Sequence, residues 1–62
     1  MISFDTFSYE NPRPKGMPHD EYNMMIKRQY REYILENLNM ILNMQDNQRE
    51  FQLGVLLFLE TL

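Results

Sequence analysis

The run Val55-Leu56-Leu57-Phe58-Leu59 places five large apolar side chains in succession in a chain of only 62 residues. A domain of this size buries only about 60% of the surface of its unfolded chain, so it has little surface of its own with which to cover such a run. Chains shorter than roughly 70–80 residues usually need a disulfide, a metal or oligomerisation for stability. The chain contains no cysteine and one histidine. We therefore expect another protein surface, in the first place that of a second copy, to cover the run.

This run belongs to a predicted helix of about residues 47–61. Asn47, followed by Glu50 three residues later, resembles a capping box, and Asp46 is the alternative N-cap. The helix becomes apolar on nearly all sides toward its C-terminal end, and such a helix is expected to be buried on all sides. The predicted oligomer interface comprises Phe51, Val55, Leu56, Leu57, Phe58, Leu59 and Leu62.

A longer amphipathic helix is predicted over about residues 19–44. No glycine or proline occurs between Pro18 and Gly54, and Pro18 suits a position at the start of a helix. Apolar residues recur at steps of three and four, which is the period of one helix face. They are Tyr22, Met25, Ile26, Tyr30, Tyr33, Ile34, Leu38, Ile41 and Leu42.

The polar residues 44–48 are expected to separate the two helices. Because these residues contain no glycine or proline, one continuous helix of about 40 residues is the competing interpretation. We favour an antiparallel hairpin, since a chain this short gains an internal core only by folding back. At 1.5 Å per residue the helices would be roughly 39 Å and 22 Å long, so part of the first stays uncovered. Either the N-terminal arm or a second subunit would cover its stretch from Tyr22 to Tyr30.

Residues 1–18 are predicted to form an extended, proline-containing arm. Apolar and polar residues partly alternate over residues 2–9, as in a strand, and Pro12, Pro14 and Gly16 disfavour a helix through residues 11–17. The arm would be ordered only where its aromatic rings dock. Tyrosines on the long helix would form either a recognition surface or the edge of the core. The predicted partner-binding residues are Phe4, Phe7, Tyr9, Tyr22, Tyr30 and Tyr33.

The resulting expectation is an all-α fold with two parts: an extended arm over residues 1–18 and an antiparallel helical hairpin over residues 19–62. Two such hairpins would bury their spare apolar faces against each other as a dimeric four-helix bundle.

The sequence carries no motif for catalysis. Ser3 and Ser8 have no nearby base, and Glu32 and Glu36 lie on the polar side of their helix. His19, Asp20, Glu21 and Asn23 could be read as metal ligands, but only residues 19 and 23 of this group share a helix face. Acidic residues at a helix N-terminus are better explained by the helix dipole. We expect no enzyme activity, no cofactor, no metal and no small-molecule substrate.

The net charge of −3 disfavours non-specific binding to nucleic acid. The alternative is a nucleic-acid-binding accessory protein that uses the cations Lys27, Arg28, Arg31, Arg13 and Lys15. No signal-peptide pattern and no run of about 20 apolar residues is present, so we expect a cytoplasmic protein without a membrane segment.

These features favour a small protein–protein interaction module. Such a protein would act as a regulator, inhibitor or assembly adaptor by occupying a partner's surface, and it would bind both itself and another protein. This expectation comes from the class of protein rather than from any one residue.

Overall fold

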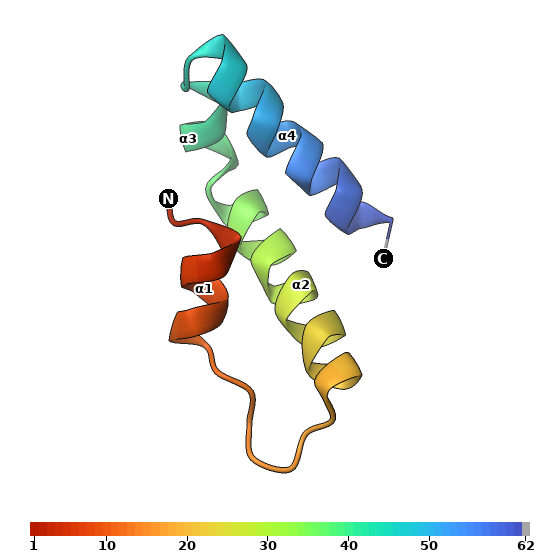
Figure 1. Ribbon diagram of the computed structural model, residues 1–62. Coiled ribbons are helices and arrows are strands. Elements are labelled where there is room, and N and C mark those ends of the chain that lie inside the picture. Colours follow the sequence, from red (N-terminus) through yellow and green to blue (C-terminus); the bar gives the residue numbers. More distant parts are fainter. Residues whose placement is uncertain (62) are drawn as a thin grey trace.

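The computed structural model describes residues 1–61, which form four helices and no strand (Figure 1). They are α1 (Phe4–Glu10), α2 (His19–Glu36), α3 (Leu38–Leu42) and α4 (Asp46–Glu60). The expected all-α class is therefore confirmed. Helix α4 folds back along α2 and also packs on α3, while α1 packs on α2 alone (Figure 1).

The expectation of an extended arm is wrong for residues 4–10, which form α1. Ser3 caps this helix, because its hydroxyl accepts a 3.2 Å hydrogen bond from the Thr6 N–H. Phe4 and Phe7, one helical turn apart, both pack against the core. The helix ends at Asn11, the residue before Pro12, where helical geometry is disfavoured. The prolines thus end a helix rather than keep the whole arm extended.

The single helix expected over residues 19–44 is interrupted at Asn37, which separates α2 from α3. The Asn37 side chain donates a 2.8 Å hydrogen bond from Nδ2 to the carbonyl of Tyr33. Such side-chain bonds offer the backbone an alternative to the regular helix ladder. The chain breaks again between Leu42 and Asp46, so the interpretation as one continuous helix is also wrong.

Helix α4 begins without the predicted capping box. Its N-cap is Gln45, which makes no side-chain cap hydrogen bond. Asn47 instead accepts a 2.9 Å bond from the N–H of its neighbour Gln48. Asp46 lies in the first turn and forms an ion pair with Arg49.

The core is small and centred on α2. Ile26, Tyr30 and Ile34 of α2 are buried, together with Ile41 of α3 and Leu59 of α4. Burial of one such side chain contributes about 1.5–3 kcal/mol to stability. With so few buried residues, each of them carries a large share of the stability of the fold. Within residues 1–61, no helix combines the length and the apolar character that crossing a bilayer would require.

Candidate protein-binding surface

Four aromatic rings join α1 to α2. Phe4 meets Tyr30 edge-on with ring centroids 5.3 Å apart, and Phe7 lies 5.3 Å from Tyr30 and 5.4 Å from Tyr33. Tyr30 and Tyr33 stack at 5.7 Å. Edge-on and offset arrangements at these distances are favourable contacts between aromatic side chains. The rings therefore fix α1 on the central part of α2.

Three tyrosine hydroxyls also bond to the backbone of residues 2–11. Tyr30 donates to the Ile2 carbonyl at 3.0 Å, and Tyr33 accepts from the Ile2 N–H at 2.8 Å. Tyr22 donates to the Asn11 carbonyl at 2.6 Å and lies 3.1 Å from that of Ser8. The pKa of Tyr30 is raised above its ordinary value of 10.0, mainly because the hydroxyl is partly buried and to a smaller extent because Tyr33 is close to it. The N-terminal segment is thus what covers this stretch of α2.

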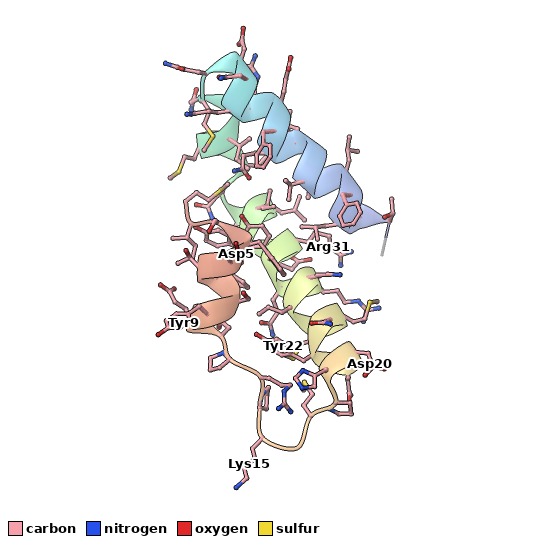
Figure 2. The ribbon with its side chains drawn as sticks, in the orientation of Figure 1. Asp5, Tyr9, Lys15, Asp20, Tyr22 and Arg31 are labelled. Carbon is pink, nitrogen blue, oxygen red and sulfur yellow. The ribbon has the colours of Figure 1, made fainter. Side chains whose placement is uncertain are left out.

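Most of the predicted partner-binding rings therefore pack against other residues of the same chain. Phe4, Phe7 and Tyr33 pack against the core that contains Tyr30. Tyr9 is different, because 87% of its surface is exposed and its side chain points away from the helices (Figure 2). Partner binding by these residues stays a prediction, and among them Tyr9 has the most surface free for it.

The predicted oligomer interface on α4 divides into an inner and an outer part. Leu59 is buried inside the chain, and Val55 and Leu56 are half-buried. Phe51, Leu57 and Phe58 remain 67%, 71% and 64% exposed, while Leu62 lies outside the described residues. Folding of one chain therefore buries only the inner part of the apolar surface of this helix.

A groove, here called the α1–α4 groove, runs between α1 and α4. These two helices both pack on α2 but do not pack on each other. Two hollows of about 180 Å³ each lie along the groove, and both are lined by Phe4, Tyr30 and Val55. The first extends to Lys27, Phe58 and Leu59, and the second extends to Ser3, Asp5, Phe51 and Gln52.

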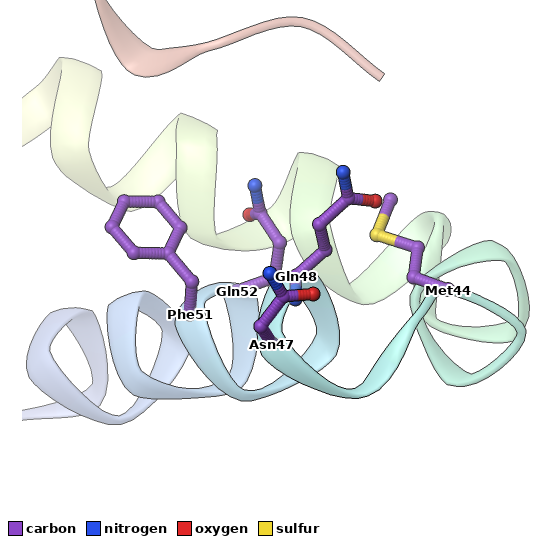
Figure 3. Close-up of a pocket in the computed structure, with 5 residues that line it drawn as sticks. All are labelled: Met44, Asn47, Gln48, Phe51 and Gln52. Atoms are coloured by element: carbon purple, nitrogen blue, oxygen red, sulfur yellow. The ribbon is translucent and has the colours of Figure 1, made fainter.

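A third hollow, of about 400 Å³, lies at the start of α4 (Figure 3). It is lined by Met44, Asn47, Gln48, Phe51 and Gln52. The Gln52 side-chain oxygen is buried and finds no hydrogen-bond donor among the described residues. Phe51 and Gln52 thus belong to both this hollow and the α1–α4 groove.

The cations proposed for nucleic-acid binding lie on two parts of the chain: Lys27, Arg28 and Arg31 on α2, and Arg13 and Lys15 in the loop before it. Lys27 lines the α1–α4 groove, whereas Arg28 lines a separate hollow of about 500 Å³ beside Met24 and Met25. Arg13 donates a 2.6 Å hydrogen bond to the Met17 carbonyl within its own loop. Lys15 points away from the helices at the tip of that loop (Figure 2). Nucleic-acid binding by these cations stays a prediction.

The residues considered for metal binding lie apart from the α1–α4 groove, whereas Ser3, one of the two serines considered for catalysis, lines it. His19, Asp20, Glu21 and Asn23 are exposed at the start of α2. Among residues 1–61, no group of three or more His, Asp or Glu side chains is placed to hold a metal ion. The hydroxyl of Ser3 lies 3.2 Å from that of Thr6, and the Ser8 hydroxyl donates to the Asp5 carbonyl. Both serines therefore act in the local structure of α1.

The chain matches no protein-family model, no curated protein and no solved structure. The case for function therefore rests on the geometry of α4 and the α1–α4 groove.

Proposed function

We propose that this protein is a non-enzymatic protein–protein interaction module that associates through the outer side of α4. Two chains would form a dimeric four-helix bundle, and the assembled protein would occupy a partner's surface as a regulator, inhibitor or adaptor. The supporting observation is that Phe51, Leu57 and Phe58 are each more than 60% exposed although all three are large and apolar.

The physical reason is the free energy of the exposed apolar surface. Complete burial of one Phe or Leu side chain is worth about 1.5–3 kcal/mol. Three such residues on one helix therefore represent a gain that is large beside the stability of a small domain. Clustered apolar side chains exposed to solvent commonly mark interaction sites, whereas single ones need no explanation.

Sedimentation equilibrium of the purified full chain tests this proposal, from low micromolar to near-millimolar concentration. We expect the wild type to be dimeric and Phe58→Asp to be monomeric, because a charge would be buried at the contact. Since Phe58 is largely exposed in one chain, its variant should keep the far-ultraviolet circular dichroism of the wild type. Tyr9→Asp is the matched control, an exposed aromatic on α1, and should stay dimeric. A monomeric wild type, or a dimeric Phe58→Asp, would contradict the proposal.

Photo-crosslinking separates self-association from binding to another protein. A photoreactive residue in place of Phe51 should give a product of twice the chain mass in purified protein. The same residue in place of Tyr9 should give no such product in purified protein. In cells it should give a product of a different mass, which identifies the partner by mass spectrometry.

A further inference from the structure

Gly54 lies in the middle of α4, and no contact or backbone conformation within the chain requires a glycine there. A glycine inside a helix costs roughly 0.5–1 kcal/mol relative to alanine. Gly54 is exposed, and a Cβ atom built on it would meet no atom within 4 Å. Its φ is not positive, unlike that of Gly16, so its backbone does not require glycine. What a glycine does allow at an exposed position is the close approach of another backbone.

The residues around Gly54 are arranged symmetrically. Phe51 and Phe58 lie equally far from the Gly54–Val55 peptide bond, and their seven-residue separation spans about 10.5 Å of helix. Because the steps from Phe51 to Gly54 and on to Phe58 are three and four residues, all three lie on one side of α4. A two-fold contact uses the same patch on both subunits and must therefore be self-complementary. Antiparallel α4 helices that cross at Gly54 satisfy this condition, because each Phe51 then lies beside Phe58 of the other copy.

The charges along the α1–α4 groove select the same orientation. Lys27 lines the hollow at the Phe58 end of the groove, and Asp5 lines the hollow at the Phe51 end. The ion pair within residues 1–61 joins Asp46 and Arg49, so neither Lys27 nor Asp5 has such a partner in the described part of the chain. An antiparallel second copy brings its Asp5 to Lys27 and its Lys27 to Asp5. A parallel copy would instead place like charges together.

We propose that the α1–α4 groove and the adjoining side of α4 bind a second copy of this chain about a two-fold axis. The two α4 helices run antiparallel and cross at Gly54, and Lys27 of each copy pairs with Asp5 of the other. This inference rests on the proposed function and specifies the partner, orientation and register of that association.

Charge reversal tests the orientation. Lys27→Asp and Asp5→Lys should each weaken dimerisation by about tenfold, because each substitution turns both symmetric pairs into like-charge contacts. The double variant restores opposite charges and should return the dissociation constant to near the wild-type value. Sedimentation equilibrium at low salt measures this, and added salt should reduce the differences. Asp5 also lies in the first turn of α1, but a loss of helix stability would not be repaired by Lys27→Asp.

Gly54→Gln tests the crossing point. Glutamine is a better helix former than glycine and meets no neighbour in one chain, so the variant should fold with equal or higher helicity. Its side chain would hold the two helices apart and weaken dimerisation by about tenfold. Glu60→Gln is the matched control, because Glu60 is exposed in the same helix and lies on the side opposite Phe51 and Phe58. It should dimerise as the wild type does.

The outcomes distinguish this inference from the proposed function. A double variant no better than its single parents, or a Gly54→Gln variant that dimerises as tightly as the wild type, would overturn the inference. If Phe58→Asp were monomeric in the same experiment, association through α4 would still hold in another register. A wild type that stays monomeric alone but crosslinks to a different protein through position 51 would instead assign the groove to that protein and overturn the second-copy proposal.

Discussion

The Tyr30 hydroxyl donates a 3.0 Å hydrogen bond to the carbonyl of Ile2, 28 residues earlier in the chain. Tyr33, one turn further along α2, accepts a 2.8 Å bond from the N–H of the same residue. Two side chains of one helix thus satisfy both backbone polar groups of a residue that precedes α1. A buried polar group left without a partner costs about 1–3 kcal/mol, so this pair ties the N-terminal segment to α2.

Tyr30→Phe should lower the free energy of unfolding by about 1 kcal/mol, because the Ile2 carbonyl loses its donor while the ring remains. Tyr9→Phe is the control, since Tyr9 is exposed and its hydroxyl bonds to nothing among the described residues; it should change stability little. Urea unfolding at one fixed protein concentration measures both, because the proposed association would add to the apparent stability. Equal losses in the two variants would show that the bond to Ile2 is not formed in solution.

Alkaline pH should destabilise the protein through Tyr30. Burial raises the pKa of Tyr30 above 10.0, so above about pH 10 the unfolded chain releases this proton more readily than the folded chain. The stability present below pH 10 is therefore lost as the pH rises through that value toward the folded pKa. Urea unfolding across this range, with tyrosinate absorbance as a second signal, measures the effect. Tyr30→Phe should lose stability less steeply over the same interval, and an unchanged slope would refute the assignment to Tyr30.

The helical content of α2 and α4 was predictable because their apolar residues recur at helical steps over many turns. The conformation of residues 4–10 was not, because Phe4 and Phe7 fit both a strand-like alternation and one turn of a helix. What decides between them is tertiary: the two rings contact Tyr30 and Tyr33, which lie more than twenty residues away. The break at Asn37 was missed for a similar reason, since asparagine is tolerated inside helices and a single side-chain bond marks the interruption.

The surface on α4 was predictable in kind but not in extent. The apolar composition of residues 55–59 indicated burial, yet sequence alone did not show that Leu59 faces the core of its own chain while Leu57 and Phe58 face outward. The place of Lys27 in the α1–α4 groove was not predictable, because Phe4, which lines the same hollow, is distant from it in sequence. Gly54 could have been singled out from the sequence, because a glycine inside a helix lowers the stability of that helix and so calls for an explanation.

Gln52→Met should stabilise the protein. The Gln52 side-chain oxygen is buried and has no hydrogen-bond donor in residues 1–61, and methionine has similar length without that polar group. We expect a gain of about 1 kcal/mol in the free energy of unfolding, visible as a higher melting temperature. Gln48→Met is the control, because Gln48 is exposed on the same helix and should gain little. A melting temperature at or below that of the wild type would show that Gln52 finds a donor in solution, for example across the proposed dimer contact.

The neighbouring residues Ile34 and Leu35 give a sharp test of the small core. Ile34 is fully buried, whereas 39% of the Leu35 surface is exposed. Ile34→Ala should cost about 2–5 kcal/mol, because it removes most of a fully buried side chain and leaves a cavity in the core.

A small domain has little stability in reserve, so that loss should leave Ile34→Ala largely unfolded at micromolar concentration. Leu35→Ala, the matched truncation on the next residue, should cost less than about 1 kcal/mol and remain folded. Circular dichroism melts of both variants at several concentrations provide the measurement. Comparable losses of stability at the two positions would mean that Leu35 is buried in solution. A second protein surface would then contact α2 at Leu35 as well as α4.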